Sequence, residues 1–179
     1  MGKIKLFVGI FLLCVGNVFA GQHWKTHFAY NSVQLIAMDE KEVYALANGK
    51  LFSINQQTED ITIFTNFSGL HGTDVAHIAY DKDRKQLLIL YSDGKMDILH
   101  DENMRYIPDL YNKQMTSSKR CNNITIQDNI AYLAMDFGIL TFDLDSSEFV
   151  DTYYIGPEAK DLRVLDVMLY GDSIYAQTT

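Results

Sequence analysis

The sequence predicts an all-β fold: a partial β-propeller with three four-stranded antiparallel blades and the start of a fourth. Two observations carry this prediction. Short runs with an apolar residue at every second position recur along the 179-residue chain and are separated by tight-turn residues. The unit also repeats at spacings of 45, 43 and 43 residues when its copies are aligned on Tyr44, Ile89, Tyr132 and Tyr175. Four short strands per repeat of about 40–50 residues are typical of propeller blades.

The clearest unit runs from Val43 to Ile54, where two alternating runs flank Asn48-Gly49. Asn-Gly between such runs is the strongest short-range hairpin signal, because both central residues of a type I′ turn take positive φ. The unit returns with turns expected at Asp93-Gly94 and around Gly138, and a fourth copy begins at Ile174. We therefore expect the blade hairpins to turn at Asn48, Gly49, Asp93, Gly94 and Gly138.

A further short apolar run precedes each hairpin, and another follows each complete one. We therefore expect blades at approximately 33–67, 75–111, 121–156 and 162–179. The last unit is incomplete, and an open array of blades leaves bare strand edges that invite association. We interpret 21–179 as an incomplete propeller: a fragment of a longer protein, or a chain whose missing blades come from a partner or a second copy. We expect purified 21–179 to be aggregated or oligomeric.

The first twenty residues have the pattern of a secretory signal peptide. Lys3 and Lys5 give a basic start, and the apolar stretch 6–16 is too short to span a membrane. Small residues before the junction predict cleavage between Ala20 and Gly21. No other stretch is long and apolar enough to cross a bilayer. The following residues, 21–31, alternate in part and would suit the N-terminal strand that often completes the last blade of a closed propeller.

Charge and cysteine content narrow the classes of partner. The chain has 15 basic and 23 acidic residues; cleavage removes two lysines and no acid, which leaves 13 against 23 and a net charge of −10. An acidic exported chain is a poor nucleic-acid binder.

A lipoprotein signal would acylate Cys14, but Leu13 stands where such signals have a small residue. Cleavage leaves Cys121 alone, so we expect a buried, inert thiol and no internal disulfide.

For every candidate catalytic motif in the sequence, a purely structural role is the better explanation. Asp136-Phe137-Gly138 matches the metal-binding motif of protein kinases, but the other kinase motifs are absent from the sequence. A hairpin turn explains these three residues better. The acidic runs 81–83 and 143–148 lack the ligand spacing of a calcium loop and read as solvated turns. The five histidines read as surface or satisfied core residues. We therefore expect no catalytic, cofactor-binding or metal-binding residue, and the pattern identifies no ligand-binding residue.

Several segments, in this order along the chain, resemble the N-terminal propeller of the PorZ family. They are Trp24–Tyr30, Val43–Asn55, Leu90–Leu99 followed by Ile107–Leu110, Phe137–Leu144, Tyr153–Pro157, Val164–Val167 and Ile174–Ala176. Together they cover nearly all of the chain after the predicted signal peptide. PorZ-like proteins carry two propellers and a C-terminal sorting domain, of which this chain would supply part of the first propeller.

This resemblance implies a non-enzymatic accessory role in the type IX secretion system of Bacteroidetes. It implies export to the periplasm or the outer-membrane cell surface of a Gram-negative bacterium, and partners in the complex that attaches anionic-lipopolysaccharide-linked cargo, or a surface glycan. The alternative is an oligosaccharide-sensing periplasmic propeller module of a two-component regulator. A third hypothesis, a propeller enzyme, would need His, Tyr or carboxylate side chains that converge at the ring centre.

Overall fold

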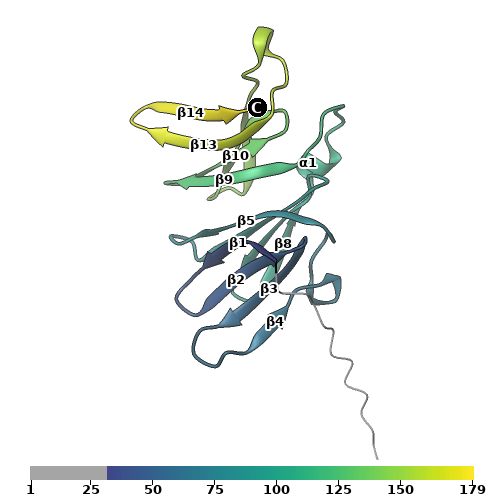
Figure 1. The fold of residues 1–179 in the computed structure, drawn as a ribbon, viewed down its shortest axis with the longest axis vertical. Helices are drawn as coiled ribbons and strands as arrows, with labels where there is room; N and C mark the ends of the chain where they lie inside the picture. The colour runs from purple at the N-terminus through teal and green to yellow at the C-terminus, as the bar shows by residue number, and fades with distance from the viewer. Residues whose placement is uncertain (1–31) are drawn as a thin grey trace, which may run out of the picture.

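The computed structural model describes residues 32–179 and confirms the all-β prediction, with three four-stranded antiparallel sheets and one two-stranded sheet (Figure 1). The predicted signal peptide, its Ala20–Gly21 cleavage site and the stretch 21–31 lie outside the described residues. Within each sheet the strands are joined in chain order, so every sheet is a simple meander.

Each sheet contains the following strands. Sheet 1 consists of β1 (Val33–Met38), β2 (Glu42–Ala47), β3 (Lys50–Asn55) and β4 (Ile61–Ile63). Sheet 2 consists of β5 (Val75–Asp81), β6 (Gln86–Tyr91), β7 (Met96–His100) and β8 (Asn103–Ile107). Sheet 3 consists of β9 (Cys121–Gln127), β10 (Ile130–Met135), β11 (Gly138–Asp143) and β12 (Glu148–Tyr153). Sheet 4 consists of β13 (Val164–Tyr170) and β14 (Ser173–Thr178).

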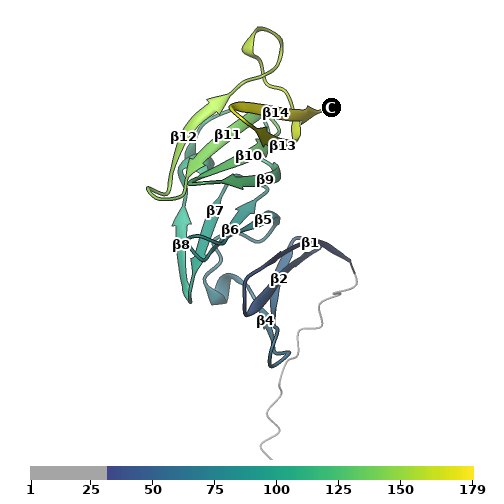
Figure 2. The same cartoon turned by 90° about the vertical axis from the view of Figure 1, so that its left-hand side faces the viewer.

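The sheets stack face to face along an arc, as blades do in a propeller. The first strands β1, β5, β9 and β13 lie beside one another in chain order, and the later strands of each sheet fan outward (Figures 1 and 2). Sheet 1 and sheet 4 lie at opposite ends of the arc (Figure 2). This arrangement makes each inner sheet bury both of its faces.

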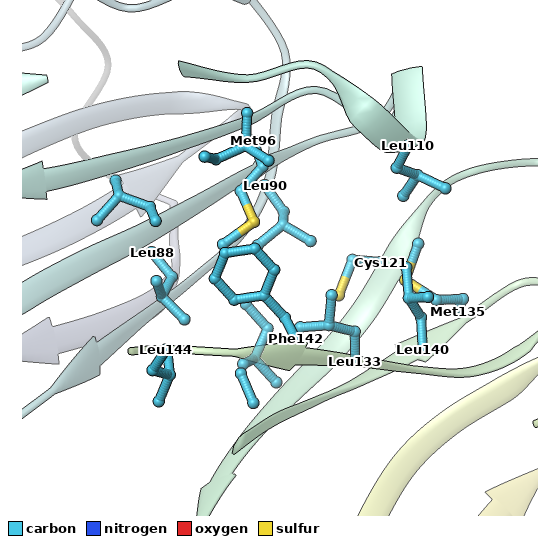
Figure 3. Close-up of a cluster of buried hydrophobic side chains, with 14 of the residues drawn as sticks. Leu88, Leu90, Met96, Leu110, Cys121, Leu133, Met135, Leu140, Phe142 and Leu144 are labelled. Carbon is cyan, nitrogen blue, oxygen red and sulfur yellow. The ribbon is translucent and has the colours of Figure 1, made fainter. Parts of the chain in front are cut away.

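Strand β6 shows how alternation produces that burial. Its residues Leu87, Ile89 and Tyr91 pack toward sheet 1, while Leu88 and Leu90 pack toward sheet 3. Successive side chains of a strand point to opposite faces, so an unbroken apolar run is what a strand between two sheets requires. The core between sheets 2 and 3 is drawn in Figure 3, where Phe142 and Leu133 of sheet 3 lie against Leu88 and Leu90 of sheet 2.

A register shift between the first two strands recurs in every sheet. It shows which residues of the four sheets are equivalent and corrects the alignment of Ile89 with Tyr44. Every sheet has a register shift at the same place between its first two strands, at Val33/Leu35, Val75/His77, Cys121/Asn123 and Val164/Asp166. Counted from this shift, the residue equivalent to Tyr44 in sheet 2 is Leu88. The alignment of Ile89 with Tyr44 is therefore wrong by one residue, which places it on the opposite face.

The cause of that error is the turn between β6 and β7. In sheet 1 the pair Ala47–Lys50 closes a two-residue loop, in which Asn48 and Gly49 have φ of 51° and 71°. In sheet 2 the loop has three residues, because Tyr91 donates its backbone N–H to Lys95 and Gly94, at φ 89°, donates to Tyr91. A type I turn followed by a left-handed residue adds one residue to the hairpin.

The third hairpin and two links also differ from expectation. Met135 pairs with Gly138, so the loop residues are Asp136 and Phe137, and Gly138 begins β11. The first blade, expected over 33–67, ends its last strand β4 at Ile63, and a 3-10 turn follows. The second blade, expected over 75–111, ends in the short helix α1 (Asp109–Asn112) after Pro108, because its last strand β8 stops at Ile107.

Candidate functional site

A cleft of about 340 Å³ opens between sheets 1 and 2 at the end of the arc that carries the β2–β3 and β6–β7 turns. Its lining comes from the link that joins the two sheets, from the end of β6 and from the turn after β6. The lining residues are Asn66, His71, Gly72, Thr73, Asp74, Tyr91, Ser92, Asp93 and Lys95. The volume falls at the lower end of the range of small-molecule sites, and the lining presents both polar and apolar surface.

The wall of the cleft is built on a buried carboxylate. The side chain of Asp97, on β7, has no exposed surface, and the side chain of His71 is 42% exposed. His71 donates its backbone N–H to Asp97 Oδ2 over 2.9 Å, and its Nδ1 lies 2.8 Å from Oδ1. The hydroxyl of Tyr91 donates to the same Oδ2. Three donors thus satisfy a carboxylate that the sheet interface has removed from water.

These contacts determine the chemical state of the wall. Because a carboxylate only accepts, Nδ1 of His71 carries a proton that it donates to Asp97. Nε2 makes no hydrogen bond to any residue in 32–179. Burial, reinforced by the bond to Asp97, raises the pKa of the Tyr91 phenol, so this hydroxyl stays protonated. The wall therefore presents to the cleft an imidazole and a phenol whose orientations Asp97 fixes.

The link that carries His71 is held rigidly. Asn66 donates its side-chain amide to the carbonyl of Leu70 over 2.7 Å, and Leu70 is buried in the core between sheets 1 and 2. Gly72 packs so closely on the ring of Tyr91 that any Cβ there would overlap the ring. Further along, Val75 donates its backbone N–H to Gly49, which joins the link to the β2–β3 turn.

Aromatic side chains surround the cleft. The ring of His71 stacks on Tyr106 of β8, with centroids 4.4 Å apart and planes within 8°. Lys95 ion-pairs with Asp93 over 2.8 Å, and its ammonium lies 4.6 Å from the ring centroid of Tyr111 on α1. Phe67, in the 3-10 turn beside Asn66, is fully exposed. This end of the arc thus presents aromatic rings on short, hydrogen-bonded links.

The opposite end of the arc has a different character. Its turns and the strand ends beside them carry more than half of the acidic side chains, namely Asp39, Glu40, Glu59, Asp60, Asp81, Asp83, Asp101, Glu102, Asp128, Asp143, Asp145 and Asp172. Many of these carboxylates cap turns: Asp143 accepts backbone N–H bonds from Asp145 and Ser146, which lower the pKa of its carboxyl group. Arg84 bridges Asp81 and Asp145 between sheets 2 and 3.

The remaining motifs have structural positions. Asp136, of the kinase-like triplet, accepts from Asn122 and pairs with Arg163 over 3.0 Å. Cys121 is buried, and burial raises the pKa of its thiol. Within residues 32–179, no group of three or more His, Cys, Asp or Glu side chains could hold a metal ion. In the same part of the chain, no helix is long and apolar enough to cross a bilayer.

One histidine lies near the axis of the arc, where the strands β5, β9 and β13 adjoin. His77 of β5 is 7% exposed, and its Nδ1 has no hydrogen-bond partner. Burial lowers its pKa to about 4, although the backbone of Ile78 and the carboxylate of Asp166 favour the protonated ring. Asn123 and Asp166, at the equivalent position in sheets 3 and 4, hydrogen-bond to each other. His77 is therefore a core residue without a full set of partners.

Sequence reasoning missed the pairing of His71 with Asp97, because the two residues are 26 positions apart and belong to different elements. One signal was present in the sequence. Asp97 stands between Met96 and Ile98, at a position of the alternating run that must face a neighbouring sheet. A carboxylate at such a position requires buried donors. The sequence could not indicate which residues supply them.

Comparisons with known proteins agree with this architecture. A family model for the PorZ N-terminal β-propeller domain of the type IX secretion system matches residues 43–179. The solved structure of PorZ from Porphyromonas gingivalis, a surface component of that system, is 32% identical with a TM-score of 0.72; the match covers 82% of this chain and 19% of that chain. This chain therefore spans about one fifth of that relative. No curated protein matches this chain.

Two further structures share the fold. The extracellular domain of the two-component system protein BT4673 from B. thetaiotaomicron is 15% identical, with a TM-score of 0.65 over 81% of this chain and 19% of that chain. AztD from Citrobacter koseri is 15% identical, with a TM-score of 0.51 over 81% of this chain and 40% of that chain. At this identity the likeness concerns the propeller fold alone. The family match extends over most of the sequence, so the chain belongs to the family of PorZ N-terminal β-propeller domains.

Proposed function

We propose that this chain is a non-enzymatic, exported propeller domain that serves type IX secretion and the surface attachment of anionic-lipopolysaccharide-linked cargo. The observation that carries the proposal is the family match over residues 43–179, together with 32% identity to a surface component of that system. The signal-peptide pattern of residues 1–20 supports export to the periplasm or cell surface.

The cleft beside His71 is the part of the domain that we assign to contact with a partner. Loops that project from a rigid β scaffold commonly carry binding residues. Here the cleft lies on hydrogen-bonded links and is surrounded by the exposed rings of Phe67 and Tyr111. Aromatic anchors with a polar rim are typical of protein-binding surfaces.

A chimera tests the secretion role. In a type IX-secreting bacterium that lacks its own PorZ, the corresponding segment of P. gingivalis PorZ is replaced by residues 43–179. Cargo attached to the cell surface is then measured by fractionation and immunoblotting. We expect the chimera to restore attachment to at least half of the level given by unmodified PorZ. Failure to restore attachment by a chimera that reaches the surface in normal amount would contradict the proposal.

Two substitutions in the chimera separate the cleft from the general role. Ser92→Trp places a large ring in the cleft lining, and Glu102→Trp places the same ring in an exposed turn at the opposite end. We expect the first variant to reduce attachment at least fivefold and the second to leave it unchanged. If both variants support attachment equally, the secretion role stands and the cleft is not the contact surface.

The alternative, an oligosaccharide-sensing module of a two-component regulator, has weaker support. The regulator domain shares the fold but only 15% of its aligned residues with this chain. No feature of the cleft distinguishes a sugar from another polar ligand. The chimera experiment also discriminates here, because a sensor module would not restore cargo attachment.

A further inference from the structure

One large apolar side chain lies in water at a place where the surrounding fold is complete. Phe67, in the 3-10 turn Asn66–Ser68, is fully exposed, more so than any other large apolar side chain of residues 32–179. Its turn belongs to the link between sheets 1 and 2, and both sheets are in place. Met168 and Tyr170 are also exposed, but they lie on sheet 4 at the end of the arc (Figure 2). The end of the arc accounts for the exposure of those two residues but not for that of Phe67.

The turn that carries Phe67 is held on both sides. Phe64 before it and Leu70 after it both pack into the core between sheets 1 and 2. The hydroxyl of Ser68 accepts the backbone N–H of Thr65 over 2.7 Å and donates to the carbonyl of the same residue over 2.9 Å. Leu70 donates its backbone N–H to Thr65 over 3.1 Å. The turn therefore holds the phenyl ring away from the rest of the protein.

The fold does not use the phenyl ring of Phe67. The hydrogen bonds of the turn come from the backbone and from the side chains of Asn66 and Ser68. Phe67 belongs to none of the four apolar clusters formed by the described residues. Burial of a phenylalanine side chain is strongly favourable. Folding leaves this gain available to a binding partner.

We propose that Phe67 is the anchor by which this domain docks to a partner protein, with its ring in an apolar pocket of that protein. The phenyl group has no polar atom, so an apolar pocket is its complement. Aromatic anchors beside a polar rim carry much of the affinity of protein interfaces. Asn66, the neighbour of Phe67, lines the cleft, so the anchor and the polar lining adjoin. This inference rests on the proposed function, because it names the residue and the kind of partner at the cleft end.

A lipid surface fits this site less well than a protein. The cleft lining beside the anchor carries the carboxylates of Asp74 and Asp93 and the ammonium of Lys95, and the whole chain has a net charge of −8. Anionic headgroups attract clusters of basic residues, which this lining lacks. One ring also offers less apolar surface than the single acyl chain that gives only marginal membrane binding. One ring is enough, in contrast, to fill a pocket in a protein.

Photocrosslinking tests the contact directly. In the chimera described above, p-benzoylphenylalanine takes the place of Phe67 and, as a control, of Glu102 in an exposed turn at the opposite end. Whole cells are irradiated, and the adducts are identified by immunoblotting and mass spectrometry. We expect one protein adduct from position 67, at least fivefold more abundant than any from position 102. No adduct, equal adducts at both positions, a sugar or lipid adduct, or a crosslink within the same chain would overturn the proposal.

Substitutions show whether the contact matters for function. We expect Phe67→Ser to lower cargo attachment at least fivefold, and Phe67→Leu, which keeps an apolar group, to retain at least half of it. Val150→Ser removes another exposed apolar side chain, on β12, and should leave attachment unchanged. Equal attachment in the three variants would contradict the anchor role.

A stability measurement separates docking from folding. Because the ring makes no core contact, Phe67→Ser in purified 21–179 should melt within about 1 °C of the wild type. A clear fall in melting temperature would show that Phe67 is a structural residue and would overturn the proposal. If the unsubstituted chimera fails to restore attachment, the secretion role fails, whereas the ratio of adducts at positions 67 and 102 still tests the anchor. If Phe67→Ser restores attachment fully, the secretion role stands and the anchor is refuted.

Discussion

Asp97 holds His71 by two separate bonds, one to the backbone N–H at 2.9 Å and one to the ring Nδ1 at 2.8 Å. The carboxylate is completely buried and receives a third bond from Tyr91. This relationship fastens the link between sheets 1 and 2 to the third strand of sheet 2. It also fixes the imidazole that forms the wall of the cleft.

Asp97→Ala should therefore destabilise the protein substantially. It leaves the Tyr91 hydroxyl and the His71 N–H groups without their acceptor, at a cost of about 3 kcal/mol in unfolding free energy. Urea unfolding followed by circular dichroism measures the loss. Asp93→Ala, which removes a half-exposed carboxylate of the neighbouring turn, should cost less than about 1 kcal/mol. Similar losses in the two variants would contradict the assigned role of Asp97.

His77 should make stability depend on pH. Its pKa in the folded protein is lowered to about 4, so between pH 6.5 and 4 the unfolded chain binds a proton that the folded chain does not. Its contribution to stability is complete above pH 6.5 and is lost as pH falls toward 4, by at most about 3 kcal/mol. The difference in unfolding free energy between the wild type and His77→Leu should follow this curve. A difference independent of pH would disprove it.

Gly138→Ala should be more harmful than Gly171→Ala. Gly138 has φ of 145°, and a Cβ there would overlap the backbone carbonyl oxygen of Tyr153. Gly171 has φ of 57° with no atom within 4 Å of a Cβ, so alanine there costs about 1 kcal/mol for the left-handed conformation alone. We expect Gly138→Ala to cost at least twice as much. Thermal unfolding of both variants provides the comparison, and equal melting temperatures would argue against the close approach.

Tyr44 and Tyr175 occupy the same position in the repeat but differ in burial, at 8% and 52% exposed. Tyr44 packs between sheets 1 and 2, so Tyr44→Ala should cost about 3–4 kcal/mol. Tyr175 has no following sheet in the described structure, and Tyr175→Ala should cost less than about 1 kcal/mol. Denaturant midpoints of the two variants test this. A large loss at Tyr175 would show that another surface covers it.

The exposed face of sheet 4 should cause self-association. Met168, Tyr170 and Tyr175 lie on one face and are each more than half exposed. Apolar surface next to the unpaired edge of β14 promotes contact between molecules. We expect 21–179 to elute as oligomers, and Tyr170→Ser with Tyr175→Ser to shift it toward monomer. Light scattering reads the mass, and Val150→Ser serves as a control on the edge strand β12. A monomeric wild type would refute this expectation.

The blade architecture follows from local sequence patterns. Alternation with period two and turn residues such as Asn48-Gly49 act locally, so strands and hairpins could be recognised without knowledge of the packing. The repeat then predicted that equivalent positions pack between sheets, as Tyr44 does. The sequence did not reveal the three-residue turn at Gly94. Its loop length depends on backbone geometry, and one extra residue moved the predicted equivalent of Tyr44 from Leu88 to Ile89.

The candidate site, in contrast, depends on how the sheets pack against one another. Asp97 could be suspected of needing a buried partner, but the donors His71 and Tyr91 come from a link and a different strand. Their meeting depends on how sheet 2 packs on sheet 1, which no local pattern encodes. The same holds for the low pKa of His77, because desolvation arises from neighbouring strands. Local backbone preferences are encoded within a few residues, whereas burial and pairing are properties of the assembled sheets.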